Sequence, residues 1–92
     1  MDTVRAHVYV EGRVQGVFYR DWTVRQARGL ALTGWVRNLE DGRVEAVFEG
    51  PKKFLEKMIG KCKEGPPTAN VSHIDVIWEK GTGEFSDFGV VK

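Results

Sequence analysis

Apolar and polar residues alternate at the start of the chain. Every second residue from Val4 to Val10 is apolar, and the residues between are charged or polar aromatic. This period of two is typical of a strand with one buried face. Residues 35–39 (WVRNL) and 43–49 (RVEAVFE) also have strand character, and the Asp-Gly pair between them favours a tight hairpin. The pattern predicts a first strand and, later, a two-stranded hairpin.

Two segments have apolar residues at helical spacing instead. Between the first strand and the hairpin, Val24, Ala27 and Leu30 predict a helix over about residues 21–30. A second helix is expected from Pro51, placed at the first helical position, where its missing N–H costs nothing. Gly-Pro-Pro at 65–67 ends this helix. Its apolar stripe consists of Phe54, Leu55, Met58, Ile59 and Cys62.

The remaining residues supply one or two more strands. Apolar side chains alternate again in residues 71–79 (VSHIDVIWE), and residues 84–92 can add a short last strand after the Lys-Gly-Thr-Gly turn. The order βαββαβ is that of a ferredoxin-like α+β sandwich, in which two helices cover one face of an antiparallel sheet of four to five strands. No repeat or linker divides the chain, so residues 1–92 are expected to form a single domain.

This topology brings two distant segments together. The first and second strands run in the same direction with the third between them, so both end at the same edge of the sheet. The loop after Glu11 and the residues around Asn38 should therefore meet there. Two strand spacings, roughly 9 to 10 Å, separate them, which an arginine, an asparagine and a small anion can span. The sequence thus predicts a pocket at this edge.

Composition and charge exclude several classes of protein. The chain is 41% hydrophobic and 29% charged with a formal net charge of +1, so no strong field attracts nucleic acid or an anionic membrane. A single cysteine, Cys62, excludes an internal disulfide and any multi-cysteine metal site. No apolar run reaches about 18 residues, and the alternating first residues are not expected to act as a secretory leader. We expect a cytoplasmic monomer without membrane or nucleic-acid partners.

The loop GRVQGVFYR, residues 12–20, could bind an anion. Gly12 and Gly16 permit backbone angles that let successive N–H groups turn inward as a nest, and the following helix adds its positive end. Arg20 can place its planar fork on two phosphate oxygens. Glycine loops after strands are also often simple turns, so the residues alone leave both interpretations open. No Gly-Lys-Ser/Thr follows, so this is not a Walker loop.

Asn38 likewise has two interpretations. An asparagine just before a hairpin turn commonly braces the turn or its own backbone. Its amide could instead hold a water molecule in line with a phosphorus atom. Alternation places Asn38 on the same face as Val36. If Val36 points under the helices, Asn38 points toward the start of the helix that carries Arg20.

Other candidate catalytic residues are weaker. His7 and His73 fall on the polar faces of predicted strands, so both are expected to face solvent, and no pair has metal-ligand spacing. Cys62 lies on the apolar helix stripe and is expected in the core. Glu40 and Asp41 are consecutive, so their side chains should diverge, and they are interpreted as turn residues.

Two extended motifs together resemble a known family. GRVQGVFYR at 12–20 followed by GWVRNLEDGRVE at 34–45, with the Gly-Pro-Pro turn and Val71 beyond, is similar to the signature pair of the acylphosphatases. Tyr19 stands where that family more often has phenylalanine. The resemblance implies hydrolysis of acyl phosphates to a carboxylate and inorganic phosphate, without a metal or other cofactor.

The resemblance also implies roles for particular residues. Arg20 would bind the phosphoryl oxygens, and Asn38 would orient the attacking water. In the mechanism usually proposed for the family, the phosphate itself accepts the proton of the water, which fits the absence of an obvious base near Asn38. The backbone amides of five residues would form the phosphate cradle: Gln15, Gly16, Val17, Phe18 and Tyr19.

Two alternatives remain. The chain could be a non-catalytic, anion-binding acylphosphatase-like module, since such domains occur within larger maturation enzymes. RNA-recognition domains share the βαββαβ order and read bases with aromatic residues. The third predicted strand lacks their basic-glycine-aromatic pattern, and the near-neutral charge also argues against RNA.

Overall fold

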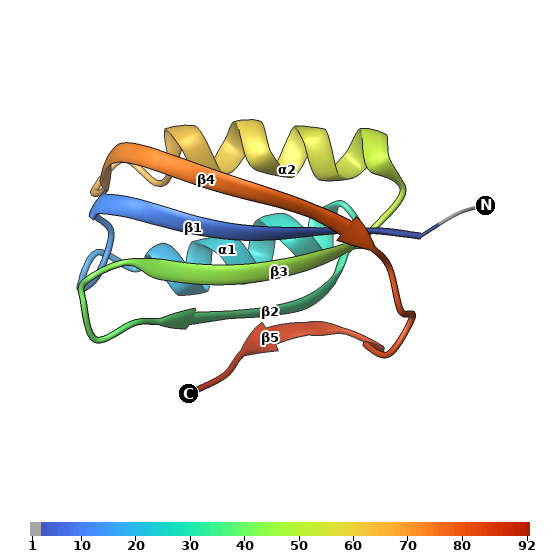
Figure 1. Ribbon diagram of the computed structural model, residues 1–92. Coiled ribbons are helices and arrows are strands. Elements are labelled where there is room, and N and C mark those ends of the chain that lie inside the picture. Colours follow the sequence, from blue (N-terminus) through green and yellow to red (C-terminus); the bar gives the residue numbers. More distant parts are fainter. Residues whose placement is uncertain (1–2) are drawn as a thin grey trace.

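The computed structural model describes residues 3–92, which form an α/β sandwich (Figure 1). The elements follow the predicted order, and the short last strand that residues 84–92 could add is present. Their bounds are β1 Val4–Arg13, α1 Tyr19–Gly29, β2 Thr33–Asn38, β3 Val44–Gly50, α2 Lys52–Glu64, β4 Asn70–Lys80 and β5 Phe88–Val90.

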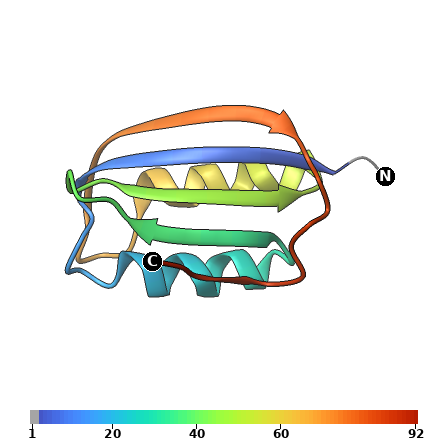
Figure 2. The same cartoon turned by 60° about the horizontal axis from the view of Figure 1, so that its bottom comes forward.

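The strands form one sheet in the order β4-β1-β3-β2-β5. Both helices pack on the same face, α1 against β2 and β5, and α2 against β4 and β1 (Figures 1 and 2). The ferredoxin-like α+β fold is confirmed, but the sheet is mixed, because β5 pairs in parallel with β2. The segment 81–87 carries the chain from β4 at one edge to β5 at the other, and this long crossing sets the direction of β5.

The core lies between the sheet and the helices. Inward-facing residues of β1, namely Ala6, Val8 and Val10, are at most 1% exposed, as their alternation predicts. From α2, Leu55 and Met58 are fully buried against them. Burial of these side chains provides most of the driving force for folding and fixes which face of each strand is available for a site.

Both helices begin differently from the prediction. Helix α1 starts at Tyr19, two residues earlier than expected, because Phe18 adopts a left-handed conformation (φ 63°, ψ 23°) that turns the chain into the helix. Pro51 is extended (φ −62°, ψ 138°) and precedes α2. Its carbonyl accepts hydrogen bonds from the amides of Phe54 and Leu55, so it caps the helix instead of occupying the first helical position.

The sheet face that points away from the helices contains ion pairs that the sequence did not indicate. His7 was expected to face solvent but is half-buried, with its Nε2 2.6 Å from Oε2 of Glu45. Arg37 donates to the other oxygen of Glu45 at 2.6 Å, so this buried carboxylate is paired on both sides. In the described part of the chain, no helix is both long and apolar enough to cross a membrane.

Candidate functional site

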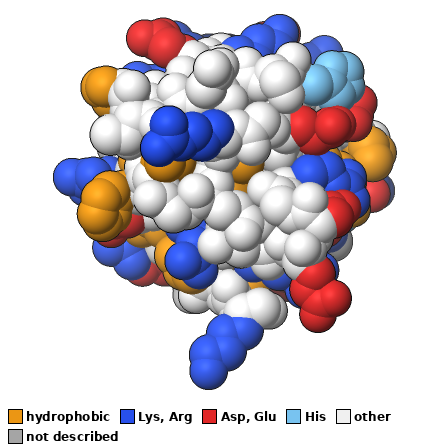
Figure 3. Space-filling view, turned by 90° about the vertical axis from the view of Figure 1, so that its left-hand side faces the viewer, with side chains coloured by type: hydrophobic (Ala, Val, Ile, Leu, Met, Phe, Trp, Pro, Cys, Tyr) orange, Lys and Arg blue, Asp and Glu red, His pale blue; other side chains and the backbone are white. Residues whose placement is uncertain are grey.

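Strands β1 and β2 end on the same side of the molecule, as the topology predicts, because β3 lies between them and is antiparallel to both. The loop after β1 and the β2–β3 hairpin therefore meet at this end. Viewed directly, this end shows mainly backbone and uncharged polar atoms with basic side chains among them, while acidic side chains lie toward its rim (Figure 3). The local surface is compatible with an anion although the whole chain is nearly neutral.

The loop between β1 and α1 contains two left-handed residues, Gly16 (φ 72°) and Phe18 (φ 63°). Left-handed residues turn successive N–H groups toward the concave side of a loop. Within residues 3–92, the backbone amides of residues 15–20 donate no hydrogen bond to a carbonyl in a turn, loop or neighbouring element. The first amides of a helix also lack partners inside it, and no side chain caps α1. These donors are therefore available to a ligand.

Glycine is required at Gly16 in the loop and at Gly12 near the end of β1, for different reasons. A Cβ at Gly16 would meet nothing within 4 Å, so only the positive φ favours glycine there. At Gly12 a Cβ would lie 2.2 Å from the carbonyl oxygen of Asn70, because β1 and β4 approach closely beside a bulge at Glu11/Gly12. Gly16 therefore shapes the loop, whereas Gly12 allows β1 to pack closely against β4.

Four hydrogen bonds from three side chains hold the loop in place, and the sequence did not reveal them. Gln15 donates from Nε2 to the carbonyls of Leu39 (2.7 Å) and Arg43 (2.9 Å), which ties the loop to the β2–β3 hairpin. Thr68 donates to the carbonyl of Val17 at 2.7 Å. The hydroxyl of Tyr19 donates to the carbonyl of Cys62 at 2.7 Å. The loop is thus fixed from the hairpin, from the segment before β4 and from α2.

Asn38 is the last residue of β2, and its Oδ1 is buried without a hydrogen-bond partner among the described residues. Leaving a buried carbonyl unpaired costs about 1–3 kcal/mol, so such an atom requires an explanation. The alternation predicted that Asn38 shares a face with Val36 but left open which face that is; because Val36 is fully buried, Asn38 lies on the helix side of the sheet. The turn is braced by other groups: Arg43 donates from its backbone amide to Asp41 at 3.0 Å. Within the described residues, Oδ1 of Asn38 therefore takes no part in bracing the turn.

Arg20 lies in the first turn of α1 and is exposed. Like Arg13, it makes no ion pair within residues 3–92, whereas every other arginine there is paired with a carboxylate. Asp21, its neighbour, pairs with Arg25 one turn further along the helix at 3.2 Å. That pair offsets the negative charge next to Arg20 and leaves the guanidinium free to meet an anion.

These groups surround one pocket of about 250 Å³. Its lining residues are Val14, Gly16, Phe18, Tyr19, Arg20, Asp21 and Asn38. Of the predicted site residues, the structure brings Gly16, Phe18, Tyr19, Arg20 and Asn38 to this pocket. Gln15 and Val17 belong to the same loop but do not line the pocket: the side chain of Gln15 reaches the hairpin, and Val17 is 6% exposed.

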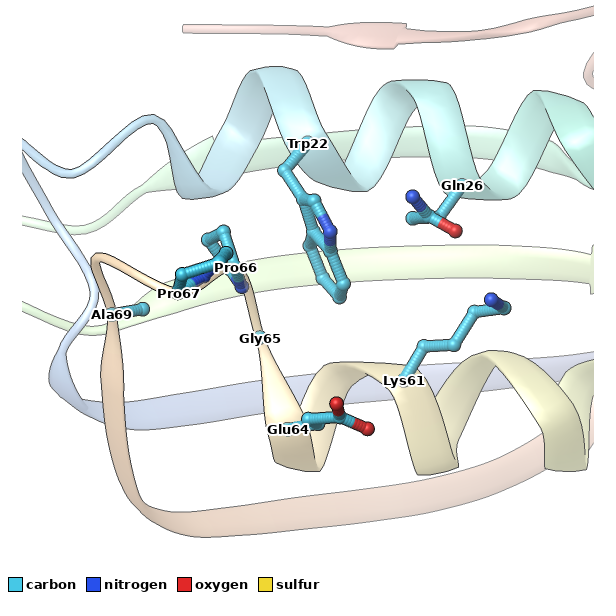
Figure 4. A pocket seen from close by; sticks show the side chains of 8 residues that line it. All are labelled: Trp22, Gln26, Lys61, Glu64, Gly65, Pro66, Pro67 and Ala69. Atoms are coloured by element: carbon cyan, nitrogen blue, oxygen red, sulfur yellow. The ribbon is translucent and has the colours of Figure 1, made fainter.

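A larger hollow of about 470 Å³ lies between α1 and α2 (Figure 4). Trp22 and Gln26 extend from α1 on one side, and Lys61 and Glu64 line the α2 side. One end is closed by Gly65, Pro66, Pro67 and Ala69. Lys61 is the one cationic residue that lines this hollow, and the carboxylate of Glu64 lines it too. None of the residues lining the hollow has a buried side-chain atom without a hydrogen-bond partner. By volume this hollow would be the better candidate for an anion site. The smaller pocket is the better candidate by its chemistry, because Arg20 and the unpartnered Oδ1 of Asn38 line it.

The weaker candidates do not enter either pocket. Cys62 is 1% exposed, and burial raises the pKa of its thiol to about 12, so it is a core residue and not a nucleophile. His73 is exposed, as predicted, and lies 2.9 Å from Asp75. The sequence indicated no metal-ligand spacing, yet the fold gathers Glu11, His73 and Asp75 so that their ligand atoms lie within 4.8 Å of one another. None of these three lines the pocket of Arg20 and Asn38.

Comparisons with known proteins agree on one family. The family model described as Acylphosphatase matches residues 6–90. A curated Acylphosphatase of Roseiflexus sp. (strain RS-1) is 53% identical over 91 residues, which cover 99% of this chain and 98% of the relative. The crystal structure of acylphosphatase from Bacillus subtilis superposes with a TM-score of 0.93 at 35% identity, covering 97% of this chain and 99% of the other.

A longer protein shares the same fold in part of its length. Full-length HypF, crystallised in a phosphate- and nucleotide-bound form, matches 98% of this chain with a TM-score of 0.85 and 27% identity, but the match covers only 12% of HypF. In contrast, the match covers 98% of the Roseiflexus relative and 99% of the Bacillus subtilis chain, and both are named for the enzymatic activity. The comparisons therefore support the catalytic interpretation and give no support to a non-catalytic module.

Proposed function

Because the chain belongs to the acylphosphatase family, it hydrolyses the carboxyl–phosphate bond of acyl phosphates, and we propose that the pocket lined by Arg20 and Asn38 is where it does so. The observation that supports this site most strongly is the unpartnered Oδ1 of Asn38. Asn38 lines the same pocket as Arg20, which has no ion pair within residues 3–92, and as the start of α1, which no side chain among those residues caps. The fold alone gives no role to Oδ1 of Asn38, to the guanidinium of Arg20 or to the first amides of α1. A bound phosphate would pair with the guanidinium and the amides, and a bound water would pair with Oδ1.

The phosphoryl group is held by the chain itself. Its oxygens accept hydrogen bonds from the amides of residues 15–19 and from the guanidinium of Arg20. The positive end of α1 adds to this field. The carboxyl oxygen that links phosphate to the acyl group faces away from the cradle. As that bond lengthens, negative charge spreads over the phosphoryl oxygens, where the fixed donors stabilise it without further reorganisation.

The attacking water is positioned by Asn38. The water donates one hydrogen to Oδ1, which orients its oxygen toward phosphorus on the side opposite the leaving carboxylate. The new oxygen–phosphorus bond forms as the bond to the carboxylate breaks. The remaining proton passes to a phosphate oxygen, so the products are a carboxylate and inorganic phosphate. No protein base is required, in keeping with the roles of Glu40 and Asp41 at the hairpin turn.

The same proposal extends to the form in which the protein works. Its apolar core is one cluster shared by both helices and the sheet, which favours a single domain over residues 1–92 acting as a monomer. The buried, lone Cys62 and the absence of strong net charge favour the cytoplasm, with no membrane or nucleic-acid partner. Its ligands are then the acyl phosphate and inorganic phosphate, with no cofactor.

Metal removal tests the chemistry directly. We expect purified protein to hydrolyse acetyl phosphate at an unchanged rate after dialysis against excess chelator, because the cradle and Arg20 supply the charge stabilisation that a metal would otherwise provide. Release of inorganic phosphate is measured with and without chelator. A rate that collapses in chelator and recovers with added Mg²⁺ or Zn²⁺ would contradict the proposed mechanism.

A further inference from the structure

Phe18 stands out within the proposed site because its side chain is 78% exposed although it lines the pocket. The other apolar or aromatic side chains of the pocket, Val14 and Tyr19, are at most 2% exposed and belong to the core. The aromatic ring of Phe18 is therefore the apolar surface that this pocket offers to a ligand.

The fold does not account for a phenylalanine at this position. Its φ of 63° is left-handed, a conformation that costs an L-residue about 1–2 kcal/mol and that glycine adopts freely. A ring this exposed recovers little of that cost through packing. Neither the local backbone nor the core favours an aromatic residue here, which leaves the ligand as the group that can use it.

The ring is also held on a fixed backbone. The carbonyl of Val17, immediately before it, accepts the hydrogen bond from Thr68, and the side chain of Tyr19, immediately after it, is buried and bonded to the carbonyl of Cys62. Because both neighbours are anchored inward, the side chain between them is presented at the rim of the pocket. A preorganised aromatic surface binds with little loss of conformational entropy.

We propose that Phe18 selects the acyl group and favours acyl phosphates whose acyl part is aromatic or otherwise bulky and apolar. The inference rests on the proposed function, since the phosphoryl group must occupy the cradle for the acyl group to reach the ring. The acyl group is joined to phosphate through one oxygen and extends toward the opening. There an aromatic acyl group covers the ring of Phe18, whereas an acetyl group is too small to do so.

Loss of the Phe18 ring should change KM and not kcat. The contact between ring and acyl group is remote from the phosphorus and is the same in the bound substrate and in the transition state. Such uniform binding lowers KM and leaves kcat unchanged. A residue that positioned the reacting atoms would instead change kcat for every substrate.

The test compares benzoyl phosphate with acetyl phosphate. In Phe18→Ala, the KM for benzoyl phosphate should rise about tenfold while the KM for acetyl phosphate changes less than about twofold. Alanine is as disfavoured as phenylalanine in the left-handed region, so this variant removes the ring without changing the backbone preference. Phe18→Leu, which keeps an apolar side chain, should recover part of the affinity. Both variants keep the backbone amide that residue 18 contributes to the cradle and lose only the ring, so titration with inorganic phosphate should give a Kd close to that of wild type.

A matched control is available on β4, where Ile77 is 49% exposed and does not line the pocket. Ile77→Ala should leave the ratio of the two KM values unchanged. Equal effects of Phe18→Ala on both substrates, or no effect on either, would overturn the assignment of Phe18. An Arg20→Ala protein that kept its activity would instead overturn the phosphate site itself, so the two failures are distinguishable.

Discussion

Replacing Arg20 by alanine should reduce kcat/KM for acetyl phosphate by about 10³-fold or more. Removing one preorganised donor to developing charge costs about 10²–10³ in kcat, and Arg20 contributes a full charge and two parallel donors besides. The affinity for inorganic phosphate should also fall, by about 10- to 100-fold, because a charge-assisted hydrogen bond contributes about 1.5–3 kcal/mol. Steady-state hydrolysis and calorimetric titration with phosphate measure the two effects.

Two further arginine variants make this result specific. Arg20→Lys keeps the charge but not the planar fork, so it should recover only a small part of the activity. Arg13→Ala removes the same charge from another arginine that has no ion pair within residues 3–92 and does not line the pocket. Its kcat/KM should stay within about threefold of wild type, since exposed charges are screened by solvent. Comparable losses in Arg13→Ala and Arg20→Ala would show that net charge matters and that the specific geometry does not.

The variant Asn38→Ala should separate catalysis from binding. We expect kcat to fall about 100-fold, the usual cost of misplacing a reacting group by about 1 Å, while the Kd for inorganic phosphate changes less than about threefold. Among the described residues, Oδ1 makes no hydrogen bond, so its removal should not lower the free energy of unfolding. Phosphate release, phosphate titration and denaturant unfolding measure the three quantities.

A second substitution at the same position provides the contrast. Asn38→Asp keeps the size of the side chain but adds a negative charge beside the phosphate, so it should weaken phosphate binding where Asn38→Ala does not. Glu40→Ala, at an exposed position of the adjacent turn, serves as the control and should leave all three quantities unchanged. Loss of phosphate affinity in Asn38→Ala equal to that in Arg20→Ala would contradict the division of roles between the two residues.

Pattern and topology were sufficient to predict from the sequence that the loop of Arg20 and Asn38 meet at one pocket. The alternation in β1 and the Asp-Gly hairpin gave the strand order, and the strand order in turn placed Asn38 opposite the loop of Arg20. Parity with Val36 gave two possible faces for Asn38, and only burial against the helices decided between them. The chemical assignment needed the resemblance to a family, because a glycine loop and an asparagine before a turn have ordinary structural explanations.

What could not be predicted depends on contacts between residues distant in sequence. The amide of Gln15 reaches carbonyls 24 and 28 residues away, and no local pattern signals that reach. The parallel pairing of β5 depends on the path of residues 81–87 across the end of the sheet. His7 was assigned to solvent by the alternation of β1, but its partner Glu45 lies on a neighbouring strand, and the contact leaves His7 half-buried.

The most direct test of the central claim is a titration of ¹⁵N-labelled protein with inorganic phosphate, followed by amide chemical shifts. The account predicts that the largest shifts fall on residues 15–20 and follow one binding curve, whose Kd equals the inhibition constant of phosphate against acetyl phosphate hydrolysis. Shifts concentrated instead around Trp22, Lys61 and Glu64, in the hollow between α1 and α2, would contradict it.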